Sequence, residues 1–282
     1  MATLTPPATL IPRSSEANKP ERAAIPSASN KLPVATVENG LERTSAGLPI
    51  AYERGRLTFM GVELLTAPGA LVPRTETELL GRTALGLLVG QSPQGTGLNM
   101  IDMCCGSGNL ACGIARSVGR LRVYAADLTD GCVSLAQRNV DQLGLRRRVS
   151  VHQGDLFGAL ADHALAARID MVVCNPPYIS TGRLDGERAD LLRHEPREAF
   201  DAGPYGLAVH QRLIREATTV LRPGGWLLCE IGHGQQRQVG RLFGRVGAYE
   251  TVEFVNDSTG EPRVAMARVA RLAEGAPAEL AA

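Results

Sequence analysis

The stretch Asn175-Pro176-Pro177-Tyr178 directly follows a run of four apolar residues. An apolar run that ends in two prolines predicts a buried strand that stops abruptly. The Asn175 side chain offers one carbonyl acceptor, and the peptide carbonyl of Pro176 offers a second on a backbone stiffened by the prolines. Two acceptors side by side suit a planar NH2 group, and Tyr178 can stack on the flat face of that group. Accepting both hydrogens would hold the nitrogen lone pair in one direction, which predicts catalysis by orientation.

Another apolar run ends in a glycine-rich loop, in the sequence DMCCGSGNLA that begins at Asp102. Gly106 and Gly108 remove side chains where a backbone must approach a ligand closely, and the helix that follows presents free N–H groups. The spacing matches the dinucleotide fingerprint G-x-G-x-x-A loosely, and a structural glycine turn is the alternative interpretation. Asp102, at the tip of the predicted strand, is expected to face the same ligand.

Two more strand ends carry carboxylates that suit an adenosine group. Asp127 lies roughly 20 residues beyond Gly106, where a carboxylate can accept hydrogen bonds from both ribose hydroxyls. Its alternative role is to cap the next helix. Asp155 is placed to accept from an adenine amino group, with Leu156 and Phe157 against the ring, although an aspartate is also common in plain turns. An NAD enzyme and an S-adenosylmethionine enzyme both fit these features, and Asn175 favours the second because its NH2-binding arrangement suits methyl transfer to nitrogen.

The positions of these residues depend on an alternation of strand-like and helix-like segments. We predict strands at 98–103, 121–126, 149–153, 169–174, 225–231, 249–255 and 263–269, and helices at 76–90, 109–118, 131–143, 206–221 and 234–246. This alternation predicts an α/β fold in which helices cover both faces of a mostly parallel sheet. Ligands bind at the carboxyl ends of the strands in such sheets, which is where the residues above are expected to lie.

The chain of 282 residues is expected to divide into four parts. The proline, alanine and serine content of residues 1–45 predicts a flexible leader. A short β-rich segment is expected over residues 46–75. The catalytic domain is expected over 76–271, followed by a flexible tail over 272–282.

Composition excludes several classes of protein. A net charge of +1 gives no global field that points to nucleic acid, and no basic stretch with interleaved aromatics is present, so a nucleic acid is not expected as the direct substrate. The six cysteines form no C-x-x-C pair, which favours buried thiols in a reducing cytoplasm over a metal site. No apolar stretch approaches the roughly 20 residues of a membrane span. A cytoplasmic protein without a metal is therefore expected.

Several motifs together resemble the HemK/PrmC family of protein glutamine-N5 methyltransferases. Pro73-Arg74-Thr75-Glu76-Thr77-Glu78 is similar to the family's proline-arginine-x-glutamate-threonine-glutamate signature, and the loop, NPPY, HEPREAFDAG and LRPGGWLLCEIGHGQ also match. The resemblance covers roughly residues 48–270. It implies a Rossmann-like class I fold with a seven-stranded sheet, S-adenosylmethionine as cofactor and a release-factor type protein as substrate.

The resemblance also implies a site, residue by residue. It places the substrate amide on Asn175, Pro176, Pro177 and Tyr178, and Arg74 and Glu76 near the substrate pocket. A charged, solvated helix start is the alternative for that pair. It places the cofactor on Asp102, Cys104, Cys105, Gly106, Ser107, Gly108, Asp127, Leu128, Asp155, Leu156 and Asn175.

Three features depart from the family pattern. Cys104 stands where the family's loop normally begins with glycine, so its side chain is expected to narrow the cofactor pocket. A leader with several prolines stands in place of the family's helical N-terminal domain. The segment 180–194, which lies over the expected substrate mouth, is rich in arginine and aspartate. Adenine N6, a small-molecule amide or amine, an NAD-dependent oxidoreductase and a non-catalytic binding factor therefore remain alternatives.

Overall fold

The computed structural model describes residues 36–38, 41–45, 47–91 and 97–271. Strands β1 (Thr36–Glu38) and β2 (Leu41–Arg43) pair antiparallel. This short hairpin lies within residues 1–45, for which the sequence predicts a leader. Most of the predicted leader, and all of the predicted tail, lies outside the described residues.

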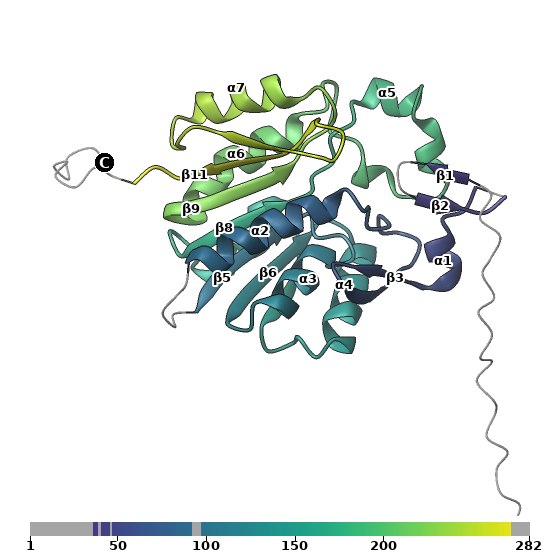
Figure 1. Cartoon of the computed structure of the whole chain (residues 1–282), viewed down its shortest axis with the longest axis horizontal. Coiled ribbons are helices and arrows are strands. Elements are labelled where there is room, and N and C mark those ends of the chain that lie inside the picture. The colour runs from purple at the N-terminus through teal and green to yellow at the C-terminus, as the bar shows by residue number, and fades with distance from the viewer. Residues whose placement is uncertain (1–35, 39–40, 46, 92–96, 272–282) are drawn as a thin grey trace, which may run out of the picture. The chain divides into compact units, whose positions relative to one another are not determined.

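A seven-stranded sheet forms the centre of the described part of the chain (Figure 1). Its order is β10-β11-β9-β8-β5-β6-β7, and β11 runs antiparallel to both of its neighbours. The mostly parallel sheet predicted from the sequence is confirmed. The strands are β5 (Leu98–Met103), β6 (Leu121–Asp127), β7 (Val149–Gln153), β8 (Ile169–Cys174), β9 (Leu221–Glu230), β10 (Glu253–Asn256) and β11 (Pro262–Arg268).

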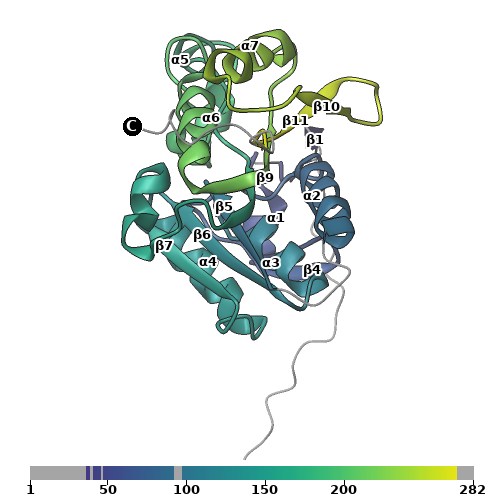
Figure 2. The same ribbon diagram turned by 90° about the vertical axis from the view of Figure 1, so that its left-hand side faces the viewer.

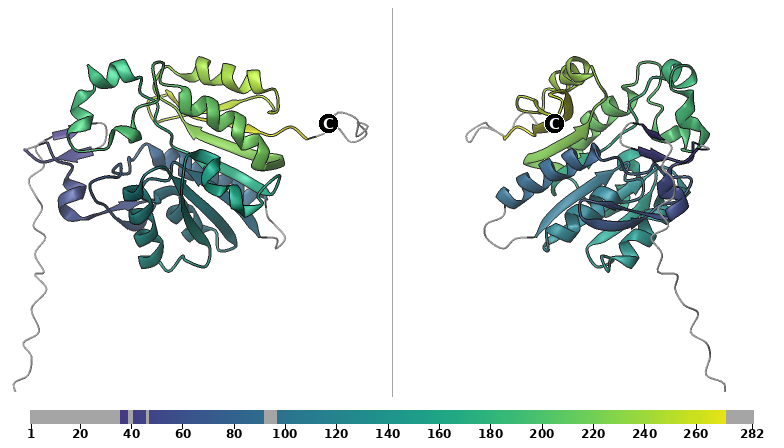
Figure 3. Two further views of the ribbon diagram at one scale, coloured as in Figure 1. Left: turned by 180° about the vertical axis from the view of Figure 1, so that it is seen from behind. Right: turned by 45° about the vertical axis from the view of Figure 1, so that its right-hand side comes forward.

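Helices cover both faces of this sheet. Figure 2 shows α2 and α6 on opposite sides of β9, and the view from behind in Figure 3 shows α6 in front of the strands. One face carries α2 (Thr77–Gln91), α3 (Asn109–Ser117) and α4 (Asp130–Gln142). The other carries η1 (Leu156–His163), α6 (Ala208–Val220) and α7 (Gln236–Val246). The remaining helices are α1 (Ile50–Arg54), α5 (Thr181–Asp185), η2 (Ala189–Arg193) and η3 (Arg197–Ala199).

Strand β8 shows why the apolar run before Asn175 has no polar alternation. All six of its residues are buried, since Met171 packs in the core on one face and Val172 in the core on the other. A strand covered on both faces reads as a continuous apolar segment.

A second hairpin, β3 (Arg56–Phe59) and β4 (Val62–Leu65), is joined to the main domain by the buried side chain of Asn139. Its Oδ1 accepts from the Leu65 N–H at 2.7 Å, and its Nδ2 donates to the Leu65 carbonyl at 3.2 Å. Nδ2 also donates to the Ser107 carbonyl at 2.9 Å. One amide therefore connects the hairpin to the glycine-rich loop.

Within the described residues, no helix is both long enough and apolar enough to cross a membrane.

Asn139→Ala is expected to lower the free energy of unfolding by about 2–4 kcal/mol, because it leaves backbone groups of Leu65 and Ser107 without partners. Gln142→Ala is the matched control, since the exposed Gln142 donates to the same hairpin at the Glu63 carbonyl. Its effect should stay within about 0.5 kcal/mol. Urea denaturation measures both, and equal effects would contradict the role given to Asn139.

Candidate active site

A cavity of about 330 Å³ opens at the carboxyl ends of the parallel strands β5, β6, β7 and β8. These strand ends come together because the chain order reverses between β5 and β8, which is the switch point where α/β sheets bind ligands. Of the residues predicted from the sequence, those that line the cavity are Arg74, Cys104, Cys105, Gly106, Asp127, Leu128, Asp155, Leu156, Asn175 and Pro177.

Other predicted residues do not line this cavity. Asp102 is fully buried, and its Oδ2 accepts from the Ala111 N–H at 2.8 Å, so it ties the start of α3 to β5. Burial raises the pKa of the Asp102 carboxyl to about 7, and the Ala111 hydrogen bond opposes that rise. The predicted residues outside the lining are Asp102, Ser107, Gly108, Glu76, Pro176 and Tyr178.

The glycine-rich loop turns through three left-handed backbone positions. Cys104, Gly106 and Gly108 have φ values of 56°, 55° and 75°. Glycine adopts this conformation freely, whereas a residue with a Cβ such as Cys104 loses about 1–2 kcal/mol there. Cys104 is among the residues that line the cavity, and the narrowing of the pocket by its side chain stays a prediction.

Asp127 holds this loop in place from the end of β6. Its Oδ2 accepts from the Gly106 N–H at 2.8 Å, and its Oδ1 accepts from the Thr129 N–H at 3.3 Å. Thr129 itself caps α4 by accepting from the Cys132 N–H. The cap that the sequence offered as an alternative role for Asp127 thus belongs to Thr129. Each Asp127 oxygen keeps lone-pair capacity for a ligand.

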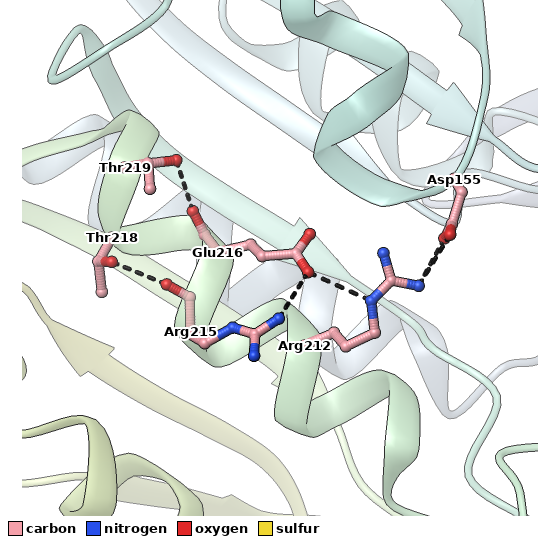
Figure 4. A network of polar contacts seen from close by, with 6 residues as sticks. All are labelled: Asp155, Arg212, Arg215, Glu216, Thr218 and Thr219. Atoms are coloured by element: carbon pink, nitrogen blue, oxygen red, sulfur yellow. Dashed lines mark hydrogen bonds and ion pairs between the residues drawn. The ribbon is translucent and has the colours of Figure 1, made fainter.

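Asp155 at the cavity rim is paired with a residue that the sequence did not indicate (Figure 4). Both of its oxygens accept from Arg212 Nη1, at 2.8 and 2.9 Å. Arg212 Nε in turn donates to Glu216 at 3.2 Å. A carboxylate accepts about four hydrogen bonds, so Asp155 retains capacity for a ligand amino group beside Arg212.

A second cavity of about 40 Å³ adjoins the first. The two cavities share Leu71, Arg74, Asn175 and Ala199 in their walls. The smaller one is also lined by Tyr178 and Glu230. Asn175 therefore stands where the two cavities meet.

A buried polar network joins the walls of both cavities, since Thr77 lines the larger one and Glu230 lines the smaller one. Asn175 Nδ2 donates to Thr77 Oγ1 at 3.0 Å, and Thr77 Oγ1 donates to Glu230 Oε2 at 2.8 Å. The Tyr178 hydroxyl and Arg263 Nη2 both donate to Glu230 Oε1 at 3.3 Å. Burial raises the pKa of Glu230, and Arg263 is the strongest influence opposing that rise. Burial together with Glu230 raises the pKa of Tyr178 to about 12, so the phenol stays protonated.

Sequence reasoning missed Thr77, Glu230 and Arg263 as parts of the site. Glu230 did carry a signal, because it is a carboxylate in the apolar run WLLCEI. A charge in a buried strand needs partners, and their identity depends on the fold.

Two further polar side chains brace the walls. Glu195, whose side chain is fully buried, accepts from Arg74 Nη2 at 2.6 Å and from the Val72 N–H at 3.1 Å. Gln235 Nε2 donates to the carbonyls of Tyr178 at 2.9 Å and Gly206 at 3.1 Å. Arg74 and the loop after β8 are thus held by residues outside the cavities.

Glu76 is half-buried, and its Oε2 has no hydrogen-bond partner among the described residues. Among the described residues, no group of three or more His, Cys, Asp or Glu side chains is placed to hold a metal ion.

The fold is that of a Rossmann-like class I methyltransferase. A methyltransferase from Pyrococcus furiosus superposes with a TM-score of 0.52 at 16% identity, over 75% of this chain and 90% of that one. A ribosomal protein L11 methylase from Lactobacillus delbrueckii subsp. bulgaricus gives a TM-score of 0.50 at 17% identity, over 72% of this chain and 83% of that one. Residues 83–203 match the model of the methyltransferase small domain family.

Sequence relatives are more specific. The release factor glutamine methyltransferase of Moorella thermoacetica is 37% identical over 227 residues, which is 80% of this chain and 77% of that protein. The enzyme of the same name from Salmonella typhimurium is 36% identical over 228 residues, or 81% and 78% of the two chains. The chain belongs to the release factor glutamine methyltransferase family.

Asp127→Ala is expected to weaken S-adenosylmethionine binding by about 1.5–3 kcal/mol, because a charged hydrogen-bond acceptor is lost. Asp130→Ala, at the exposed first turn of α4, is the control and should bind normally. Titration calorimetry gives both dissociation constants. Unchanged affinity in Asp127→Ala would mean that the ribose is bound elsewhere.

Proposed function

We propose that this enzyme transfers a methyl group from S-adenosylmethionine to the side-chain amide nitrogen of a glutamine in a peptide-chain release factor. The observation that carries the proposal is the position of Asn175 in the wall shared by both cavities. Its Nδ2 is occupied by Thr77, which leaves Oδ1 as an acceptor. The names of the relatives from M. thermoacetica and S. typhimurium support the same target.

The larger cavity suits S-adenosylmethionine, which supplies an electrophilic methyl group on sulfur when bound. Its volume lies within the range of small-molecule sites. Asp127 would accept from the ribose hydroxyls, and Asp155 would accept from the adenine amino group while still paired with Arg212. Leu156 would pack against the adenine, and the loop from Cys104 to Gly108 would pass close to the rest of the cofactor. Ser107 and Asp102 would shape that loop from within the core.

The smaller cavity suits the acceptor amide. Its volume of about 40 Å³ corresponds to roughly three water-sized groups, which is the number of heavy atoms in a carboxamide. Arg74 lies in the wall of this cavity and would position the substrate polypeptide. Glu76, two residues further along the chain, would lie near the same pocket.

Asn175 Oδ1 and the Pro176 carbonyl would each accept one hydrogen of the acceptor NH2 group. An amide nitrogen is a poor nucleophile because its lone pair is delocalised. The two hydrogen bonds would direct that lone pair toward the larger cavity. Pro177 would keep the loop rigid, and the Tyr178 ring would lie against the flat face of the amide. The two carbonyls would also stabilise positive charge on nitrogen as it gains the methyl carbon, before one proton leaves to water.

Labelled S-adenosylmethionine with purified release factors, beside a whole-lysate protein fraction, tests the target. We expect label on a release-factor glutamine, located by mass mapping. Label on another protein, on nucleic acid or only in the small-molecule fraction would contradict the proposed target while leaving the enzyme class intact.

Asn175→Ala is expected to lower the transfer rate by about 100-fold or more, because one of two oriented acceptors is lost. Cofactor binding should be reduced but measurable by calorimetry. Asn256→Ala, at an exposed position in β10, is the control and should transfer normally. Full activity of Asn175→Ala would overturn the amide-clamp mechanism.

A further inference from the structure

The Asn175 amide is attached to a buried chain of side chains from two other elements. Thr77, which begins α2, is 1% exposed, and Glu230, which ends β9, is 2% exposed. We infer that Thr77 and Glu230 are positioning residues that fix which end of the Asn175 amide faces the methyl acceptor. This inference rests on the proposed function and deepens it, since it concerns the same acceptor site.

The direction of each hydrogen bond follows from counting protons. A carboxylate such as Glu230 can only accept, so the single hydroxyl proton of Thr77 points to Glu230 Oε2. The lone pairs of Thr77 Oγ1 are then left for Asn175, and only the NH2 end of the amide can donate to them. The carbonyl end of Asn175 is thereby turned away from Thr77 and kept for the acceptor.

The opposite orientation of the amide would bring Asn175 Oδ1 against the lone pairs of Thr77. Thr77 and Glu230 are both buried, so one polar group would lose its partner without compensation from bulk water. Such a loss disfavours the reversed amide by about 10-fold to 100-fold. A reversed amide would also present its NH2 group to the NH2 group of the acceptor, where neither can accept.

Glu230 has enough donors to remain an acceptor. Arg263 reaches Oε1 from β11, and the Tyr178 hydroxyl reaches the same oxygen from the loop after β8. Glu76, at the start of α2, is the negatively charged neighbour that acts against ionisation of Glu230. Because two donors meet at Oε1 and one at Oε2, the two oxygens have distinct roles.

Thr77→Val keeps the shape of the side chain and removes its hydroxyl. We expect kcat for methyl transfer to fall about 10-fold to 100-fold, while the Kd for S-adenosylmethionine changes less than about 3-fold. Thr77→Ser retains the hydroxyl and should restore kcat to within about 3-fold of the original enzyme. Thr83→Val is the control, since Thr83 lies in the same helix and its hydroxyl donates to the Leu79 carbonyl.

Glu230→Gln tests the direction of the hydrogen bonds that join Glu230, Thr77 and Asn175, while the shape of the side chain at position 230 is kept. The carbonyl oxygen of the introduced amide is expected to take the Oε1 side, where Tyr178 and Arg263 donate. Its NH2 group would then donate to Thr77, whose proton would turn to Asn175 and reverse that amide. We expect a loss of kcat at least as large as in Thr77→Val. The double variant Thr77→Val/Glu230→Gln should show no further loss, because each single substitution already disrupts the hydrogen bonds that orient Asn175.

A structural readout keeps this test separate from the test of the substrate. In the ¹⁵N spectrum of the protein, the Asn175 side-chain NH2 signal is identified by its absence from Asn175→Asp. We expect this signal to shift in Thr77→Val and in Glu230→Gln and to remain unchanged in Thr83→Val. If the original enzyme labels no glutamine, the proposed function fails, whereas the NMR result still decides the orientation of Asn175.

Three results would overturn the inference. They are full kcat in Thr77→Val, full kcat in Glu230→Gln, and an Asn175 NH2 signal that neither substitution shifts. Failure of Thr77→Ser to restore activity in a folded protein would likewise mean that Thr77 acts by its shape and not by its hydroxyl.

Discussion

The buried carboxylate of Glu230 is the constraint around which the wall of the smaller cavity is organised. A carboxylate removed from water must be hydrogen-bonded, and the donors here come from separate parts of the chain. Thr77 approaches from α2, Tyr178 from the loop after β8, and Arg263 from β11. The position of Glu230 follows from strand pairing, because Cys174 of β8 and Cys229 of β9 are register partners and the next residues are Asn175 and Glu230.

The same reasoning explains why the larger and the smaller cavity meet at the tip of β8. On its other side, β8 pairs with β5 so that Cys174 lies opposite Met103. The glycine-rich loop therefore starts beside Asn175, and the larger cavity opens on that side. The end of β8 thus lies between the two cavities, and Asn175 at that end lines both of them.

The sequence predicted the strands well and the contacts between them poorly. The strands predicted at 98–103, 149–153 and 169–174 have the observed bounds, because their apolar residues stop just before a glycine-rich loop, Gly154 and Asn175-Pro176 respectively. The hairpin at 36–43 was missed, since its three-residue strands are too short for a period and stand next to many prolines. The direction of the Asp102 side chain was also beyond the sequence, because a residue near the end of a strand can face a ligand or the following helix. Contacts such as Thr77 to Glu230 join positions 153 apart and leave no local pattern.

The recognisable motifs contain the side chains that line the cavities. The hydrogen-bond partners of these side chains determine which of their atoms face a cavity. Asn175 has its nitrogen occupied by Thr77, so its oxygen is the atom left for a ligand. Asp127 is restrained by the Gly106 N–H and keeps its remaining lone pairs for the cavity. Tyr178 has its hydroxyl hydrogen-bonded to Glu230, which restrains the position of its ring. In each case the protein binds one end of a polar group and so lowers the freedom of the other end before any ligand arrives. This preorganisation reduces the entropy lost on binding, and it resides largely in residues that no short motif contains.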